Sequence, residues 1–208
     1  MTVKLGGAFS NDFLYTIAKY NCIYVTEKVF SGITDVTNPQ GILAVIGKNT
    51  DINEIDYNQN LFLVLDNIQD PGNMGTILRT ADSINLKQII VSKGTADCYN
   101  PKVVRSTMGA IFRVKVIECE DLKKVVKEMK KRKIKVYATD LQTDKSIYDV
   151  DYKKSAIVIG NEANGVSKEL LEIADEKIRI PMIGKTESLN AAVATGIILY
   201  EVVRKGNI

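Results

Sequence analysis

Residues 61–81 read LFLVLDNIQDPGNMGTILRTA, and the class of fold follows from this stretch. Its first five residues form an unbroken apolar run, which is typical of a parallel strand buried on both faces. Pro71 and Gly72 predict a turn, Asn73 is a good helix N-cap, and helical apolar spacing follows at Met74, Ile77, Leu78 and Ala81. A strand, a turn and a helix in this order indicate a βα unit of an α/β protein.

The same alternation continues toward the C-terminus. Apolar runs predict further strands at 88–92, 112–118, 134–139, 156–159 and 177–180. Helical patterns stand around and between them at 74–84, 101–110, 121–132, 167–174 and 189–205. Residues 57–208 are therefore expected to form a mostly parallel sheet with helices on both faces.

Residues 1–56 have a different pattern. A helix is expected near 12–20, with strands at 23–26 and 42–46, which is too little for an independent hydrophobic core. The polar stretch 49–60 is rich in Asn and Asp and is typical of a linker. We therefore expect a small α+β module over 1–56 and a second domain over 57–208.

The composition excludes several kinds of chemistry. The 208 residues include no histidine, so triads, dyads and metal sites that need an imidazole are impossible. Three cysteines, with no CxxC spacing, argue against a disulfide scaffold or a zinc site and fit a reducing compartment. The sequence predicts a cytoplasmic protein without a resident metal.

Charge and hydropathy indicate a soluble chain. The longest uncharged apolar stretch, 188–200, is too short to span a bilayer, and no signal peptide is expected. The net charge is +3, and eight Lys/Arg stand in 123–135 against the single Glu128. Such a run can attract a phosphate backbone, or it can be the solvated face of an amphipathic helix. Both interpretations remain open.

Three strand-to-helix loops carry the polar side chains that could do chemistry. They span 70–81, 157–167 and 180–190, and they offer Asn73, Arg79, Glu162, Ser188 and Asn190. Each side chain also has a plain structural explanation as a cap or a surface group. A site of this composition suits a reaction in which the cofactor is already activated and the protein mainly aligns the reactants. Neither GxGxxG nor GxxxxGK[ST] is present, which disfavours NAD binding and triphosphate hydrolysis.

In this order and spacing, the three segments resemble the signature motifs of the SpoU (TrmH-like) branch of the SPOUT methyltransferases. DPGNMGTILRTA is similar to motif one, IGNEANGVS to motif two and IPMIGKTESLNAAVATGIILYE to motif three. NPKVVRSTMGA is similar to the stretch that the family has between motifs one and two. The resemblance covers roughly residues 35–205, and Ala191-Ala192 departs from the bulkier residue and serine common in the family.

The resemblance implies an S-adenosylmethionine-dependent RNA ribose 2′-O-methyltransferase. It also implies a C-terminal trefoil knot and a homodimer with its sites near the interface. The family's cofactor-binding positions correspond to Thr139, Gly160, Ile180, Met182 and Leu189. Its catalytic and substrate-orienting positions correspond to Asn73, Arg79, Glu162, Ser188 and Asn190. Because an arginine is almost never deprotonated, we expect Arg79 to bind the adjacent phosphate rather than to act as a base.

Residues 1–56 resemble the tail of the ribosomal-protein-like module that precedes the catalytic domain in rRNA-directed members, and 29–46 match best. We expect the front of that module to be missing from this sequence, and the remnant favours rRNA over tRNA as substrate. Two other functions stay open: a noncatalytic RNA-binding or ribosome-assembly factor that keeps the fold, and a nucleotide-dependent oxidoreductase on an ordinary Rossmann sheet.

Overall fold

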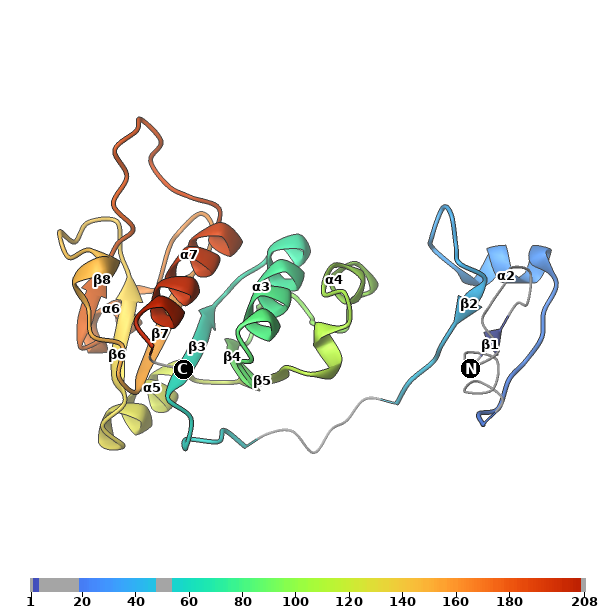
Figure 1. Cartoon of the computed structure of the whole chain (residues 1–208), viewed down its shortest axis with the longest axis horizontal. Coiled ribbons are helices and arrows are strands. Elements are labelled where there is room, and N and C mark those ends of the chain that lie inside the picture. Colours follow the sequence, from blue (N-terminus) through green and yellow to red (C-terminus); the bar gives the residue numbers. More distant parts are fainter. Residues whose placement is uncertain (1, 4–18, 48–53, 207–208) are drawn as a thin grey trace. The chain divides into compact units, whose positions relative to one another are not determined.

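A computed structural model describes residues 2–3, 19–47 and 54–206 (Figure 1). The chain divides into two compact units, Met1–Thr50 and Asp51–Ile208.

The larger unit is built on a six-stranded sheet in which every neighbouring pair is parallel. The strand order is β5-β4-β3-β7-β6-β8. β3 and β7 lie at the centre, and the apolar run of β3 is buried along its whole length, as predicted. The bounds are β3 Leu61–Asp66, β4 Gln88–Ser92, β5 Lys115–Cys119, β6 Lys135–Thr139, β7 Ser155–Gly160 and β8 Glu176–Ile178.

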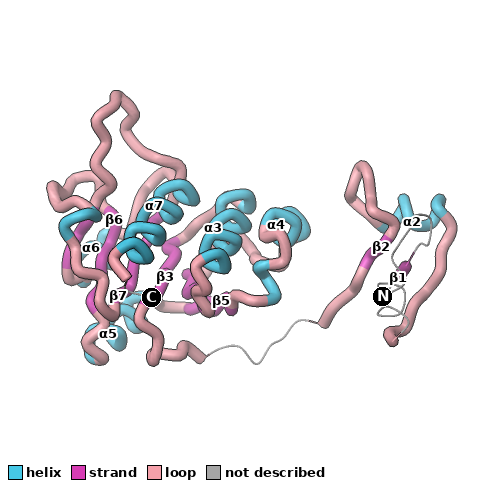
Figure 2. The backbone as a smooth tube through the Cα atoms, viewed as in Figure 1, coloured by secondary structure: helices cyan, strands magenta, loops and turns pink. Residues whose placement is uncertain are grey.

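Helices cover both faces of this sheet (Figure 2). One face packs against α3 (Pro71–Ser83), α4 (Pro101–Ser106) and α7 (Ala191–Arg204), together with the short 3₁₀ turns η1 (Ala110–Phe112) and η2 (Ile147–Asp149). The other face packs against α5 (Leu122–Lys131) and α6 (Lys168–Ile173). Because alternate residues of each strand point to opposite faces, the sheet supplies apolar side chains to both layers. The predicted α/β class is confirmed.

The segment after α4 differs from its prediction. A helix was expected to run to residue 110 and a strand to begin at 112, but α4 ends at Ser106 and β5 begins at Lys115. Met108 and Gly109 adopt left-handed backbone conformations, with φ of 50° and 85°. A helix cannot continue through two such residues, so the chain turns into η1 before it enters β5.

The smaller unit contains helix α2 (Glu27–Ile33) and a two-stranded antiparallel pair, β1 (Thr2–Val3) with β2 (Ile42–Leu43). Most of the helix predicted near 12–20 lies outside the described residues. The strand predicted at 23–26 is wrong: Ile23 forms a single bridge, and Thr26 is the N-cap of α2, accepting a hydrogen bond from the Val29 N–H. A threonine followed directly by glutamate was an N-cap signal that the prediction missed.

The second half of the predicted linker belongs to the larger unit. The buried Gln88 side chain accepts a hydrogen bond from the Asp56 N–H at 3.0 Å and donates one to the Asp56 carbonyl at 2.7 Å. Lys115 donates to the Glu54 carbonyl, and Ile55 and Tyr57 pack against the core. Residues 54–60 are therefore fixed on the amino edge of the sheet.

Candidate functional site

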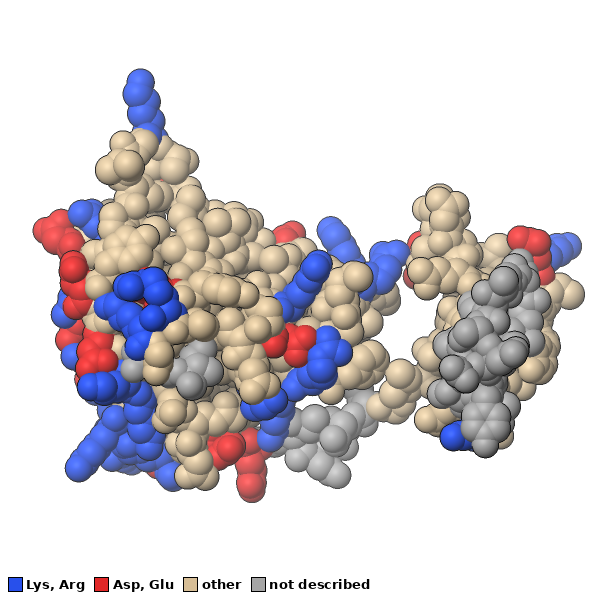
Figure 3. All heavy atoms as spheres, in the orientation of Figure 1, with Lys and Arg blue, Asp and Glu red and all other residues tan. Residues whose placement is uncertain are grey.

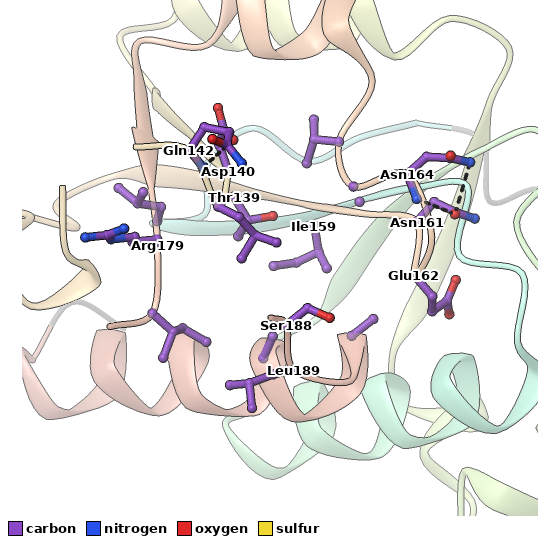
Figure 4. A pocket seen from close by; sticks show the side chains of 18 of the residues that line it. Thr139, Asp140, Gln142, Ile159, Asn161, Glu162, Asn164, Arg179, Ser188 and Leu189 are labelled. Atoms are coloured by element: carbon purple, nitrogen blue, oxygen red, sulfur yellow. Dashed lines mark hydrogen bonds between the residues drawn. The ribbon is translucent and has the colours of Figure 1, made fainter. Parts of the chain in front are cut away.

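A cavity of about 430 Å³ opens at the carboxyl ends of β6, β7 and β8. Three chain segments form its walls: 139–142 after β6, 159–166 at the end of β7, and 178–191 between β8 and α7. Figure 4 shows how these segments face the cavity from different sides. Parallel strands bring their carboxyl ends to one edge of the sheet, which is why loops distant in sequence meet here.

All five positions expected to bind the cofactor line this cavity, namely Thr139, Gly160, Ile180, Met182 and Leu189. Two of the five positions expected to be catalytic, Glu162 and Ser188, line it as well. Both side chains are exposed to solvent. The structure thus gathers seven predicted positions, from three separated segments, around one opening.

Gly160 is at the point where β7 passes into the loop. A Cβ atom there would lie 2.0 Å from the backbone of Gly165 and Val166. The loop folds back on itself at this point, because Asn161 and Gly165 exchange two backbone hydrogen bonds of 3.0 and 2.9 Å. Gly165 has a φ of 69°, a conformation that favours glycine. Gly160 is required by this close approach within the loop.

Asn161 holds the same loop and was not among the predicted residues. Its buried side chain donates to the Asn67 carbonyl at 2.8 Å and accepts from the N–H groups of Ala163 and Asn164 at 2.9 and 3.1 Å. An asparagine directly after a strand is the signal of such an Asx turn, because its side chain can accept a hydrogen bond from the backbone two residues on. Asn161 therefore ties the loop after β7 to the end of β3.

The N-terminus of α3 differs from its prediction in a way that bears on the site. Asp70, not Asn73, is the N-cap: its carboxylate accepts from the Asn73 N–H at 2.7 Å, and Pro71 follows in the first turn. A proline in the first helical turn needs no backbone partner for its missing N–H. The Asn73 side chain is consequently free of any capping role.

Asn73 instead links the three loops. Its side-chain amide donates to Oε1 of Glu162 at 2.7 Å, and its Oδ1 accepts from Nδ2 of Asn190 at 2.8 Å. The Oδ1 of Asn190 caps α7 by accepting from the N–H groups of Ala192 and Val193. Asn73 is only 8% exposed, so these two partners satisfy a side chain that water barely reaches. The result is a hydrogen-bonded chain, Glu162–Asn73–Asn190, across all three predicted motifs.

Arg79 stands apart from this group. It is exposed on α3 and does not line the cavity. Six residues beyond Asn73, it lies about 9 Å farther along the helix and roughly 120° around its axis. Among the described residues, its guanidinium has no hydrogen-bond or ion-pair partner. The fold of one chain does not bring Arg79 to the other four predicted residues.

Several polar residues line the cavity without having been predicted, among them Asp140, Gln142, Arg179 and Glu187. Asp140 accepts from the Gln142 N–H at 2.9 Å and lies 3.5 Å from the Lys177 ammonium. The contacts of the Asp140 carboxylate with Gln142 and Lys177 therefore help to shape the wall after β6. No sequence signal separated these residues from ordinary loop polarity.

The C-terminal end of α7 supports the segment that follows this wall. Lys205 donates to the carbonyls of Tyr148 and Val150 at 2.6 and 2.7 Å. Glu201, 6% exposed, is bonded to Arg204, which lowers the pKa of the glutamate carboxyl. Burial raises the pKa of Tyr152, whose hydroxyl donates to the Ile147 carbonyl. The two hydrogen bonds of Lys205 therefore fasten residues 148–150 to the end of the last helix.

The basic run on α5 has the amphipathic pattern that one of its two interpretations predicted. Leu122, Val126 and Met129 are buried. Many of its cations meet carboxylates: Lys123 with Glu169, Lys130 with Asp175, and Lys131 and Arg132 with Glu128. Lys and Arg side chains crowd the corner of the larger unit over α5 (Figure 3). Most of that charge is locally compensated.

Neither a metal-binding group of His, Cys, Asp or Glu nor a helix long and apolar enough to cross a membrane occurs within residues 2–3, 19–47 and 54–206.

The chain belongs to the SpoU rRNA Methylase family, whose pattern matches residues 60–200. This range contains the whole cavity, motifs one and two, and motif three except its last residue. The resemblance seen in the sequence is therefore confirmed at the level of the family.

Individual relatives agree with this assignment. Over 180 residues the chain is 38% identical to the 23S rRNA (guanosine(2553)-2′-O)-methyltransferase RlmP of Bacillus subtilis, and the match covers 86% of this chain and 71% of RlmP. The AdoMet-bound rRNA methyltransferase of Sinorhizobium meliloti superposes with a TM-score of 0.79 at 31% identity, over 98% of this chain and 79% of that one. AviRb of Streptomyces viridochromogenes, in complex with AdoMet, gives 0.80 at 25% identity, over 99% and 82%.

Coverage of the relatives is incomplete. A TrmH family tRNA/rRNA methyltransferase of Bacillus subtilis, YacO, is 39% identical, but the match spans only 60% of its length.

Proposed function

We propose that this protein transfers the methyl group of S-adenosylmethionine to a ribose 2′-hydroxyl of ribosomal RNA. The observation that carries the proposal is the Glu162–Asn73–Asn190 chain at the rim of the cavity, because it joins the three family motifs into one polar site. The name of RlmP, which specifies 2′-O-methylation of 23S rRNA, supports the reaction and the class of RNA.

The cavity fits the cofactor. Its volume of about 430 Å³ lies within the range of small-molecule sites. Ile180, Met182 and Leu189 offer apolar contacts, while Thr139 and the backbone of the glycine-containing loop offer polar ones. These residues would hold S-adenosylmethionine, which supplies a methyl group already activated by its sulfonium. No general acid is then needed for the leaving group.

The chain's own residues would align the ribose. Glu162 and Ser188 border the cavity and are exposed, so they can contact the sugar hydroxyls. Asn73 fixes the Glu162 carboxylate by a hydrogen bond, and Asn190 in turn holds Asn73. Holding two reactants in register is the main source of acceleration when the donor is already reactive. Arg79 offers its guanidinium group to the phosphate next to the target nucleotide.

Arg79 can serve the site if two copies of the chain associate. Val193 and Tyr200 are 51% and 53% exposed on α7, and the Tyr200 hydroxyl lies 3.2 Å from Ser83 of α3. α3 and α7 thus share an outer face with exposed apolar groups beside Arg79. We propose a homodimer through this face, with Arg79 meeting RNA at the junction.

We propose that the larger unit has the C-terminal trefoil knot that the resemblance to the family implies. We propose that the smaller unit, within the module expected over 1–56, is part of a ribosomal-protein-like module that selects rRNA, and that the larger unit, which includes residues 54–56, forms the catalytic domain. We place the protein in the cytoplasm, where rRNA is its substrate.

Two measurements test the function. Calorimetric titration with S-adenosylhomocysteine should show binding that is lost in Leu189→Trp, which fills the cavity, and kept in Ile183→Trp, whose position in the same loop is fully exposed. Labelled S-adenosylmethionine should methylate an unmodified 23S rRNA transcript. If the folded parent does not bind S-adenosylhomocysteine at all, a noncatalytic RNA-binding factor is the better explanation.

Oligomeric state tests the dimer separately. Tyr200→Asp should give a monomer in analytical ultracentrifugation and lose methyl transfer. Tyr148→Asp is the control, because Tyr148 is similarly exposed, at 51%, but lies outside the α3–α7 face, and this variant should stay dimeric. A monomeric parent with full activity would contradict the proposed arrangement.

A further inference from the structure

The arginines of this chain divide into two groups. All six lie among the described residues, and four are paired with carboxylates: Arg113 with Asp82, Arg132 with Glu128, Arg179 with Asp144 and Arg204 with Glu201. In the part of the chain that the structure describes, the guanidinium groups of Arg79 and Arg105 have no hydrogen-bond or ion-pair partner. These two stand on neighbouring helices, Arg79 on α3 and Arg105 on α4.

The two helices are locked together at one point. A Cβ atom at Gly75 would lie 1.6 Å from Oγ of Ser106 and 3.0 Å from the Val103 carbonyl oxygen. Ser106 is held there by its own hydrogen bond to that carbonyl, at 2.8 Å. Only a glycine on α3 allows this approach, so α4 has a fixed position against the first two turns of α3.

Arg79 lies on the side of α3 that faces α4. It stands one turn after Gly75, which contacts α4. One turn farther along α3, Asp82 accepts a hydrogen bond from Arg113, which follows η1. Residues at i, i+4 and i+7 share one side of a helix. Arg79 is therefore at the outer edge of the seam between α3 and α4.

The α4 side of this seam carries two more cations. Lys102 stands one turn before Ser106 and so lies on the same side of the helix, and Arg105 is its neighbour at i+3. Both side chains are exposed, and the Lys102 ammonium also has no partner among the described residues. Several separate basic side chains project from the α4 end of the larger unit in Figure 3. Three uncompensated cations thus follow one seam.

The helix dipole does not explain why both Lys102 and Arg105 stand on α4. Arg105, in the last turn of α4, is favourably placed in the helix dipole, but Lys102 is in the first turn, where the dipole disfavours a cation. Intramolecular pairing does not explain it either, unlike the basic run of α5. Exposed guanidinium and ammonium groups that a fold leaves unpaired are suited to a polyanion.

We infer that Lys102 and Arg105 bind backbone phosphates of the RNA strand that flanks the target nucleotide, next to the phosphate bound by Arg79. The inference rests on the proposed function, because it assumes that Arg79 meets RNA. The α3–α4 seam then sets the path of the strand as it leaves the site. Neither residue touches the reacting atoms; both are positioning residues.

The test uses the double variant Lys102→Ala/Arg105→Ala in the full-length protein. We expect KM for an unmodified 23S rRNA transcript to rise about tenfold, with kcat within about twofold of the parent. The affinity for a 20-nucleotide mixed-sequence single-stranded RNA should depend less on salt. The magnitude of the slope of log K against log salt should decrease by about 0.7 for each phosphate contact removed. S-adenosylhomocysteine affinity should not change.

Lys124→Ala/Lys127→Ala is the matched control, since it removes two exposed lysines from α5 and the same net charge. An unchanged KM and salt slope in the seam variant, or an equal loss in the control, would overturn the inference. Lys102→Gln/Arg105→Gln gives a second variant if the alanines destabilise α4. Failure of the parent to bind S-adenosylhomocysteine would count against the proposed function, while the RNA salt slopes would still decide about the seam.

Discussion

Nδ2 of Asn190 donates a hydrogen bond of 2.8 Å to Oδ1 of Asn73, although the two residues are 117 positions apart. Each asparagine has its second polar atom engaged elsewhere: Asn73 with Glu162, and Asn190 with the first N–H groups of α7. The amide orientation of Asn73 is thereby determined, because only its NH₂ can donate to the carboxylate. A helix cap and a carboxylate that lines the cavity are connected through one buried side chain.

Asn73→Asp should disable this chain while leaving the cavity intact. The new carboxylate can still accept from Asn190, but it loses the donor to Glu162 and places two carboxylates in contact, which is unfavourable. We expect kcat/KM to fall about 10- to 100-fold, with S-adenosylhomocysteine affinity within about threefold of the parent. Steady-state methylation and calorimetry measure both. Asn58→Asp, at an exposed asparagine, is the control. A parent-like kcat/KM in Asn73→Asp would show that the hydrogen bonds joining Glu162, Asn73 and Asn190 have no part in the mechanism.

Asn161→Ala should destabilise the larger unit. It leaves the Asn67 carbonyl and the N–H groups of Ala163 and Asn164 without their partner. Hydrogen bonds of this part-buried kind contribute about 0.5–1.5 kcal/mol each. Urea unfolding followed by circular dichroism should show a lower midpoint with an unchanged slope. The exposed Asn58→Ala should leave the midpoint where it is, and an equally stable Asn161→Ala would mean that water replaces the side chain at no cost.

Gly160→Ala should fail for a steric reason. Its Cβ would lie 2.0 Å from the backbone of Gly165 and Val166, which cannot move aside as a flexible side chain could. We expect a loss of about 1–3 kcal/mol in the free energy of unfolding and at least a tenfold weaker affinity for S-adenosylhomocysteine. Gly184→Ala is matched, because nothing lies within 4 Å of the added methyl group. A Gly160→Ala protein with parent-like affinity would show that the loop does not need this close approach.

Glu201→Gln should reduce stability in a pH-dependent way. The pKa of Glu201 is lowered in the folded protein by hydrogen bonds from Arg204, so its contribution to stability is present above the unfolded pKa of about 4.3 and is lost as pH falls through the lower folded pKa. The difference in melting temperature between parent and variant should therefore be constant from pH 6 to 8 and shrink below about pH 4. Differential scanning calorimetry across this range measures it. Glu120→Gln, at a side chain that is 81% exposed, should show little difference at any pH.

Prediction from sequence succeeded where local pattern and burial agree. The run at 61–65 became a doubly covered strand, and Gln88–Ser92 was predicted to the residue, because unbroken apolar runs have few alternatives in a parallel sheet. It failed where a single backbone conformation decides, as at Met108 and Gly109, whose positive φ values end α4 early. It also failed at the start of α3, where Asp70 and Asn73 are both good capping residues and only packing selects between them.

The α/β class and some polar residues of the cavity, among them Glu162 and Ser188, could be read from the chain, because hydrophobic periodicity and short motifs are local properties of a sequence. The strand order, which inserts β7 beside β3, is not local, and it alone brings Glu162 to Asn73. The position of Arg79, which the motif groups with Asn73, is likewise decided by the helix: residues six apart point in different directions. Adjacency in sequence indicates chemistry, but hydrogen-bond distances and helix faces determine which groups can act together.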